Sequence, residues 1–262
     1  MSRIDNANYG VHRVGGPGTQ GIFEESSTPK HPLGEKVELS DGRVFRYASI
    51  AATTAAGDIV SQDVSAATGA GLLESQDISA TAIVESDGKL TAASAGATEV
   101  TYTDSGTVGS ATLNQYAGGY LHITDDAGEG YNYRIKSNTA ASSNAITFTL
   151  FDSLQVAVTT ATDVAVTGNL YNQVRAALGT ADYIVCGVTP IAFTSGYYGW
   201  VQTRGIAVIL TDDSDVGAGV PVMCGDAQAG AVEVADNSHP LVGFVTHAAD
   251  DTGYMGVALQ LP

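Results

Sequence analysis

Three clusters of acidic residues are the groups in this sequence best suited to chemistry. They are Asp125 and Asp126 with Glu129, Asp212 and Asp213 with Asp215, and Asp250 with Asp251. Carboxylates in glycine-containing loops are typical calcium ligands, and two carboxylates held across a cleft can hydrolyse a glycosidic bond. None of the clusters has the spacing of an EF-hand, and each lies between predicted strands, where solvated turn residues are expected. The pattern therefore predicts acidic turns, with no metal ion and no cofactor.

The other candidate nucleophiles and bases lack the neighbours that catalysis requires. The five histidines are scattered, without the i, i+4 spacing of a helical zinc site. Ser195 lacks the Gly-x-Ser-x-Gly turn of a hydrolase, and the glycines of residues 15–18 do not precede a helix that could bind phosphate. Cys186 and Cys224 are expected to be small buried side chains. We therefore predict that the chain is not an enzyme.

Charge is distributed unevenly along the chain. The 262 residues include 28 Asp and Glu against 11 Lys and Arg, for a formal net charge of −17. Residues 1–46 carry six bases and six acids, so the whole net charge belongs to residues 47–262. An acidic body of this kind repels nucleic acid and anionic membranes and resists sticking to its own copies. The neutral leader is the part best able to lie against another surface.

Alternating apolar residues and turn signals predict an all-β fold, with an antiparallel β-barrel or β-sandwich type body and an extended N-terminal arm. Asp41 and Gly42 separate two alternating runs, 36–39 and 43–47, which is a strong hairpin signal. In residues 131–138 the apolar and polar side chains alternate with a clean period of two. Further strands are expected at 57–61, 99–103, 120–124, 145–151, 163–167, 183–188, 197–205, 206–210, 220–223, 241–245 and 255–259.

The composition divides the chain into four regions. Residues 1–46 are expected to form the arm and the first hairpin, because Gly and Pro interrupt a segment without apolar periodicity. An Ala-, Thr- and Gly-rich β region follows at 47–112, then a small antiparallel barrel or sandwich at 113–175 and a C-terminal β region at 176–262. Residues 170–178 are the one plausible helical turn and could equally be a linker. The sequence leaves open whether 113–175 is a separate domain or an insertion.

Four short motifs follow one another in the C-terminal region. The run GYYGWVQTRG at 196–205 precedes an Ala-Gly-x-x-Val turn at 218–222, the run PLVGFV at 240–245 and a closing MGVAL at 255–259. Their order resembles that of the decoration (cement) proteins of tailed-bacteriophage heads. The middle of the chain also resembles repeats in such proteins, so that the likeness covers residues 113–262.

The resemblance implies a non-enzymatic virion protein that binds the outside of a phage head and stabilises the shell, commonly as a trimer. Its expected partners are the major capsid protein and other copies of itself, with no nucleic acid and no membrane. It would be made in the host cytoplasm, since the N-terminus has no apolar run typical of a signal peptide. In the assembled virion it would lie on the outer capsid surface. The arm residues expected to contact the partner are Arg3, Tyr9, His12, Arg13, Ile22, Phe23 and Lys30.

Aromatic residues gather at Tyr197, Tyr198 and Trp200. They are expected to be a core anchor or an oligomer interface, and an aromatic platform for a sugar is the alternative. With that platform the chain would be a phage spike or fibre component, or a host-glycan-binding appendage. A tail-tube protein or another virion component would also fit much of the sequence.

Overall fold

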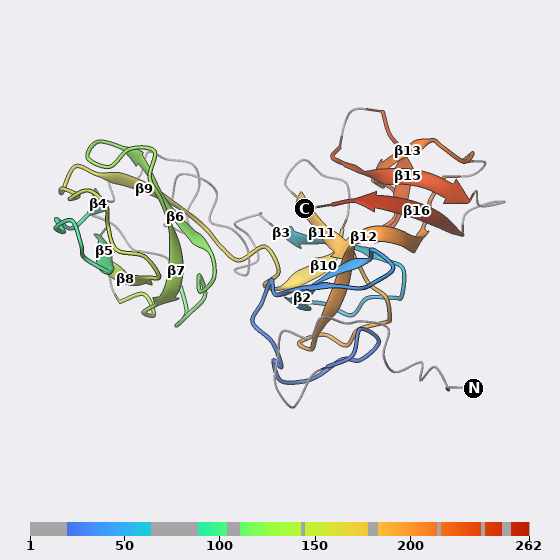
Figure 1. The fold of residues 1–262 in the computed structure, drawn as a ribbon, viewed down its shortest axis with the longest axis horizontal. Helices are drawn as coiled ribbons and strands as arrows, with labels where there is room; N and C mark the ends of the chain where they lie inside the picture. The colour runs from blue at the N-terminus through green and yellow to red at the C-terminus, as the bar shows by residue number, and fades with distance from the viewer. Residues whose placement is uncertain are drawn as a thin grey trace. The chain divides into compact units, whose positions relative to one another are not determined.

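The computed structural model describes residues 20–63, 89–103, 111–142, 145–177, 183–213, 216–236, 239–247 and 253–261. These residues form sixteen strands and no helix, which confirms the all-β prediction. Accordingly, no helix in the described residues is long and apolar enough to cross a membrane. The chain divides into two compact units, Met1–Gln62 with Tyr171–Pro262 (unit 1) and Asp63–Leu170 (unit 2) (Figure 1).

Unit 1 contains a ten-stranded antiparallel sheet in the order β10-β3-β11-β12-β16-β15-β13-β14. Strand β2 pairs with the first half of β12, and β1 pairs with β2. The bounds are β1 Lys36–Glu38, β2 Val44–Ser49, β3 Ile59–Asp63, β10 Val174–Ala176, β11 Tyr183–Val188, β12 Tyr198–Leu210, β13 Pro221–Cys224, β14 Val232–Val234, β15 Leu241–His247 and β16 Tyr254–Gln260.

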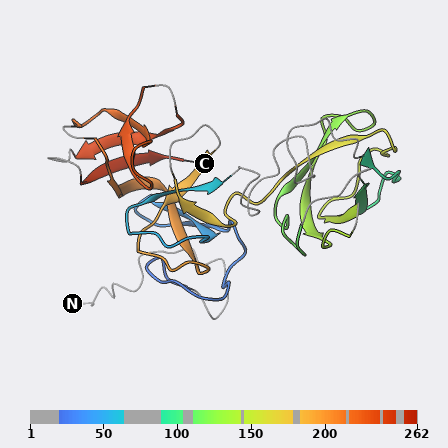
Figure 2. The same ribbon diagram turned by 180° about the vertical axis from the view of Figure 1, so that it is seen from behind.

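Unit 2 is a six-stranded antiparallel sheet in the order β4-β5-β8-β7-β6-β9. Every second side chain of β8 is buried, as the alternating sequence Ala-Ile-Thr-Phe-Thr-Leu predicts. The sheet curls like a barrel around Tyr102, Tyr116 and Phe148, and Figure 2 shows the curl from behind. The bounds are β4 Lys89–Leu90, β5 Glu99–Thr103, β6 Tyr120–Asp125, β7 Asn132–Asn138, β8 Ala145–Leu150 and β9 Asp163–Thr167.

The predicted hairpin is confirmed. Strands β1 and β2 pair with Glu38 opposite Val44, and Gly42 in the turn has φ +85°, a conformation that favours glycine. The predicted helical turn at 170–178 is wrong, because Val174–Ala176 form β10 and pair with β3. These residues adopt the strand conformation because they pair with the buried strand β3. Tertiary pairing here overrides local helix propensity.

Part of the expected arm belongs to the body. Residues 1–19 lie outside the described residues, but residues 20–35 pack on unit 1 and so belong to the body. The boundary expected at 112/113 falls inside unit 2, where β5 pairs with β8. The boundary expected at 175/176 falls inside β10. Unit 2 is therefore an insertion in the chain of unit 1, between β3 and β10.

Candidate docking groove

A bend in the longest strand creates the most distinctive feature of unit 1. The first half of β12 pairs with β2, and the second half, from Arg204 to Leu210, pairs with β16. The register shifts between Gln202 and Arg204, and Gly205 follows with φ +86°. A Cβ at Gly205 would lie 2.8 Å from Cγ and 3.1 Å from Cα of Arg43. The bend therefore requires glycine both for its backbone conformation and for its close contact with β2.

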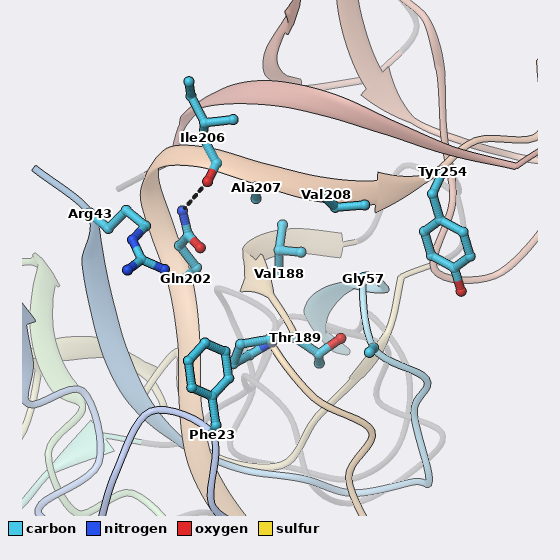
Figure 3. A pocket seen from close by; sticks show the side chains of 12 residues that line it. Phe23, Arg43, Gly57, Val188, Thr189, Gln202, Ile206, Ala207, Val208 and Tyr254 are labelled. Atoms are coloured by element: carbon cyan, nitrogen blue, oxygen red, sulfur yellow. Dashed lines mark hydrogen bonds between the residues drawn. The ribbon is translucent and has the colours of Figure 1, made fainter. Parts of the chain in front are cut away.

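Gln202 fastens the bend from inside. Its side chain is buried, and its Nε2 donates a hydrogen bond to the backbone carbonyl of Arg204 (2.9 Å). The same Nε2 donates to the carbonyl of Ile206 (3.1 Å), the bond drawn in Figure 3. The amide thus satisfies two carbonyls on either side of Gly205, which a bulged strand leaves without ladder partners. One side chain therefore holds the two halves of β12 at their angle.

Beyond the bend, no strand of the described residues lies beside one edge of β12. Among the strand pairings of the described residues, Ile206–Val208 pair with β16 alone. The N–H of Leu210 donates to the carbonyl of Gly57 (3.0 Å), so the backbone groups of Leu210 point away from β16. Because these directions alternate along a strand, the N–H and C=O groups of Val208 and Ile206 also point to this open side. Gln202 occupies the Ile206 carbonyl, and the N–H groups of Ile206 and Val208 remain available to a further strand.

A groove of about 450 Å³ lies along this open edge. Its apolar side chains are unusually exposed, with Phe23 at 62 %, Ile206 at 64 %, Val208 at 60 % and Tyr254 at 51 %. Figure 3 shows Ile206 and Val208 on the part of β12 after the bend, with Phe23 on a facing loop and Tyr254 beside the end of the strand. The lining residues are Phe23, Arg43, Ala56, Gly57, Val188, Thr189, Pro190, Gln202, Ile206, Ala207, Val208 and Tyr254.

Gly57 closes the far end of the groove. Its φ is +83°, and a Cβ there would lie 2.8 Å from Cε1 of Tyr254 and 3.1 Å from the carbonyl oxygen of Val208. The glycine N–H donates to the carbonyl of Thr189 (2.8 Å), which ties the turn to the residue after β11. Only glycine allows the turn to come this close to β12, so it sets where the open edge ends.

The apolar surface continues from the groove across the sheet. Ile206 lies opposite Ala258 of β16, and Ala258 lies opposite Phe244 of β15. Residues that face one another across antiparallel strands share a face of the sheet. Phe244 is 37 % exposed, so this face carries a row of apolar side chains that reaches the groove. A row of this kind is typical of a surface that another polypeptide covers.

The segment before β1 is held to the body by its first described residue. Trp200 Nε1 donates to the carbonyl of Gln20 (3.0 Å), Tyr47 Oη donates to Gln20 Oε1 (2.7 Å), and Gln20 Nε2 donates to the carbonyl of Tyr198 (2.8 Å). Ser26 then bridges to Tyr198, with both backbone hydrogen bonds formed. The loop between these two anchors carries Phe23, and this explains how a leader residue reaches the groove.

His31 adds a second anchor. Its ring lies 4.9 Å from the Trp200 ring and 5.1 Å from the Tyr47 ring, measured between centroids. Its Nδ1 lies 3.2 Å from Oε2 of Glu35. An aromatic cluster with a charged partner therefore packs residues 20–35 against β2 and β12.

The structure brings together only some of the residues predicted to bind a partner. Arg3, Tyr9, His12 and Arg13 lie outside the described residues. Ile22 is half-buried against the aromatic cluster around Trp200, whereas Phe23 lines the groove. Lys30 is exposed, and its backbone N–H donates to Tyr47 Oη (3.0 Å).

Of the aromatic trio, Tyr197 and Tyr198 are half-buried, and Trp200 is only 2 % exposed. Trp200 is thus part of the core, where a sugar could not stack on its ring. The sequence reasoning did not single out Gln202, Gly57, Ile206, Val208 or Tyr254. The sequence signal for the groove is the run Ile206–Leu210, whose side chains are apolar on both faces of the strand. An antiparallel strand usually needs apolar side chains on only one face.

Asp126, Asp212 and Asp213 of the acidic clusters accept hydrogen bonds from segments 16 or more residues away along the chain. Asp126 Oδ2 accepts from Thr159 Oγ1 (2.6 Å), Asp212 Oδ2 accepts from the N–H of Gln228 (3.1 Å), and Asp213 Oδ2 accepts from the N–H of Val234 (2.7 Å). Asp215, Asp250 and Asp251 lie outside the described residues. In the part of the chain that the structure describes, no three His, Cys, Asp or Glu side chains gather as a metal ion would require.

The candidate nucleophiles lie in contexts that disfavour attack on a substrate. Ser195 Oγ donates to the carbonyl of Ala51 (2.8 Å). Both cysteines are buried, as predicted, and neither forms a disulfide; burial raises the pKa of Cys186 and of Cys224 to about 12. A thiol with so high a pKa is protonated at neutral pH and is a poor nucleophile. Among the described residues, the groove is therefore the candidate site, and its exposed apolar side chains and open strand edge suit contact with another polypeptide.

No protein-family model matches the chain, and no curated protein or solved structure matches it significantly. The groove itself must therefore carry the functional interpretation.

Proposed function

We propose that this chain is a non-enzymatic structural protein of a tailed-phage virion, a decoration protein that binds the outside of the head as a homotrimer. The observation that carries the proposal is the open, apolar edge of β12. Such an edge gains hydrogen bonds and buried area when another polypeptide adds a strand to it, which is a recurrent mode of protein assembly. The decoration-like motif at 196–205 contains Gln202 and Gly205, the two residues that make the bend.

The charge of the chain supports the same role. With a net charge of −17, its copies repel one another in solution, and it has little affinity for nucleic acid or anionic membranes. Decorated particles would therefore stay dispersed. A specific attachment must then depend on shape and on local contacts, which a groove and an apolar sheet face provide.

The contact with the shell is proposed to involve the exposed part of residues 20–35 and the loops beside it. Lys30 lies in this segment and is one of nine bases among residues 20–262, against 27 acids. An exposed cation in this segment of an acidic body is well placed to contact an acidic patch of the major capsid protein. The virion surface is thus the proposed location, after synthesis in the host cytoplasm.

Binding to empty phage heads tests the proposal. Purified chain is titrated onto heads that lack it, and bound copies are counted from the mass of the particles. The expected result is saturable binding in multiples of three, with a higher temperature of head disruption. The absence of saturable binding by a folded trimer would contradict the proposal.

Lys30→Glu tests the proposed contact, and Lys36→Glu is its matched control. Lys36 is also exposed, but it lies on β1 and pairs with Glu38 (3.0 Å). Reversing a charge at the edge of an interface changes mainly the association rate and its salt dependence. Lys30→Glu should therefore slow binding to heads several-fold at low salt, whereas Lys36→Glu should leave the rate almost unchanged. Equal effects of the two variants would move the contact away from residues 20–35.

A further inference from the structure

We propose that the open edge of β12 is completed by residues 1–19 of a second copy of this chain, so that each copy donates its N-terminal segment to the next. The inference deepens the proposed function, on which it rests for the trimer, by naming what occupies the groove. It concerns copies of the chain alone, so it is tested without phage heads.

The groove fits an extended backbone better than a compact ligand. The available N–H groups of Ile206 and Val208 lie two residues apart on the same edge, which is the repeat of a strand. Exposed Ile206 and Val208 side chains flank this edge, while Phe23 and Tyr254 line the same groove. The backbone of a bound strand would thus pair with β12. Every second side chain of that strand would bury apolar surface in the groove.

Residues 1–19 have the composition and charge for this position. Two arginines against one aspartate give the segment a charge of +1, so residues 20–262 carry −18. The segment is therefore attracted to the body of any copy of the chain, although the bodies repel one another. It contains Ile4, Tyr9, Val11 and Val14, and glycines at 10, 15 and 16 leave its backbone free of bulky neighbours. Nineteen residues in extended form can span about 60 Å, which is enough to reach another copy.

The exit point of the segment lies near the groove in the sequence of unit 1. Gln20 is fixed by three hydrogen bonds to Trp200, Tyr47 and Tyr198, and Phe23, three residues later, already lines the groove. Each copy therefore presents its donor segment and its acceptor groove close together. Head-to-tail donation between copies closes into a ring when the rotation between neighbours permits. A ring of three gives the proposed trimer with every edge satisfied.

Val208→Pro removes the N–H that the incoming strand needs. This N–H points away from β16, so the substitution costs no ladder bond within the chain, and edge positions tolerate proline. Val208→Thr keeps the N–H and the β-branched shape and is the matched control. By light scattering, we expect the full chain and Val208→Thr to be trimers. Val208→Pro and a chain lacking residues 2–19 should be monomers that retain the buried environment of Trp200.

Adding the segment back as a peptide distinguishes strand donation from an indirect effect. A labelled peptide of residues 1–19 is titrated into the chain that lacks residues 2–19, and its fluorescence anisotropy is followed. We expect saturable binding that weakens with salt and is at least roughly tenfold weaker with Val208→Pro, because a strand pairing without its donor loses a hydrogen bond and gains a clash.

Three results would overturn the inference. They are a trimer that persists without residues 2–19, a Val208→Pro chain that remains trimeric, and a full chain that is monomeric although the peptide binds, which would place the segment in its own groove. Failure of the proposed function looks different, since a trimer joined by residues 1–19 that does not bind phage heads refutes only the decoration role. If heads bind the truncated, monomeric chain, the decoration role would be supported. A strand of the shell protein would then be the expected occupant of the groove.

Discussion

The two units differ in whether the edge strands of their sheets leave backbone N–H and C=O groups unpaired. In unit 2 the sheet curls until its ends meet. Leu90 N–H donates to the carbonyl of Thr162 (3.2 Å), Lys89 pairs with Asp163, and Ala93 and Val158 exchange both backbone hydrogen bonds. In unit 1 the second half of β12 keeps an unpaired edge beside the groove. A closed sheet protects its backbone groups from other chains, whereas an open one offers them.

Two exposed aromatic side chains of unit 2 have partners for their rings within the unit, although Leu113 (67 %) is also exposed there. In unit 2, exposed Phe151 lies under the guanidinium of Arg134 at 4.9 Å, and exposed Tyr131 stacks on Tyr133 at 6.1 Å. In unit 1, Ile206 and Val208 are exposed beside the open edge itself. The comparison indicates that an open edge and exposed apolar side chains coincide at the groove of unit 1, which is the arrangement a partner strand would complete.

Gln202→Glu should have the largest effect, because it places a carboxylate against two carbonyl oxygens. The side chain is 5 % exposed and donates to the carbonyls of Arg204 and Ile206, so the new group has no donor to offer them. We expect unit 1 to lose about 3 kcal/mol of its unfolding free energy. Trp200 is the single tryptophan of the chain and lies in unit 1, so denaturation followed by its fluorescence measures this unit alone.

Gln155→Glu in unit 2 is the control for that substitution. Gln155 Nε2 also donates to a backbone carbonyl, that of Ser153 (2.9 Å), but the residue is exposed. Water replaces the lost hydrogen bond, and the unfolding free energy of unit 2 should change by less than about 0.5 kcal/mol. Equal losses from the two variants would show that the Gln202 clamp does not hold the bend.

Gly57→Ala should have a smaller effect that is specific to the groove. The new Cβ would press on the Tyr254 ring and on the Val208 carbonyl, in addition to the strain of an L side chain at φ +83°. Gly42→Ala is the control, because Gly42 has φ +85° but nothing within 4 Å of the added Cβ. We expect losses of about 2 kcal/mol for Gly57→Ala and about 1 kcal/mol for Gly42→Ala. Only the former should weaken binding of the residue 1–19 peptide, and equal binding by both variants would contradict the proposed role of Gly57.

The two units should respond to pH in opposite directions. Burial raises the pKa of Asp58 and of Asp212 in unit 1, so the folded unit prefers their protonated forms. Their contribution to stability is present below the unfolded pKa of about 4 and is lost as the pH rises through the folded pKa. In unit 2 the hydroxyl of Thr159 lowers the pKa of Asp126, whose contribution is present above about pH 4 and is lost as the pH falls. The N–H of Arg43 lowers the pKa of Asp41 in unit 1, which partly opposes the first effect.

Hydrogen exchange at pH 3, 4.5 and 6 in low salt separates the two responses, once corrected for the intrinsic exchange rates. From pH 6 to pH 3 the protection of β3 and β12 should rise relative to that of β6 and β9. Asp58→Asn keeps an acceptor for the Ala55 N–H, to which Asp58 Oδ2 now bonds (2.7 Å), and should remove much of the rise in unit 1. A parallel loss of protection in both units would contradict the opposite assignments.

Most strand positions can be predicted from the sequence, but the neighbouring strands with which they pair cannot. Alternation correctly places the β1–β2 hairpin and strands such as β7 and β8, because one face of each is buried and the side-chain period records it. It misses β10 and β14, which have three residues each and too few side chains to show a period. It also gives no sign that β12 is one bent strand, since pairing with β2 and then β16 depends on segments more than 40 residues away.

The groove could be anticipated only in part. Phe23 was expected to contact a partner, and it does line the groove. Gly57 and Tyr254 are separated by nearly 200 residues, and only the folded chain brings them together with Val208. Trp200 was left open between core and binding roles, because an aromatic residue beside glycine fits both patterns. Its burial depends on Gln20 and His31, two residues of the leader that no local pattern connects to it.

Removing unit 2 should have the smallest effect and tests the comparison most directly. Gln62 of β3 lies opposite Val174 of β10, so unit 2 leaves and re-enters unit 1 at neighbouring positions. A linker of about four residues in place of residues 64–170 would turn β3 and β10 into a hairpin, and short loops cost little closure entropy. We expect the unfolding free energy of unit 1, followed by Trp200 fluorescence, to change by less than about 1 kcal/mol.

The oligomeric state of the shortened chain shows whether unit 1 is sufficient to form the trimer. If unit 1 alone is built to be completed by a partner, the shortened chain should form the same trimer as the full chain, and Val208→Pro should dissociate both. Residues 64–170 expressed alone should be monomeric at any concentration, because the edges of their sheet already meet through Leu90, Thr162 and the Lys89–Asp163 pair. An isolated unit 2 that self-associates, or a shortened chain that stays monomeric, would reverse the roles of the closed and the open sheet.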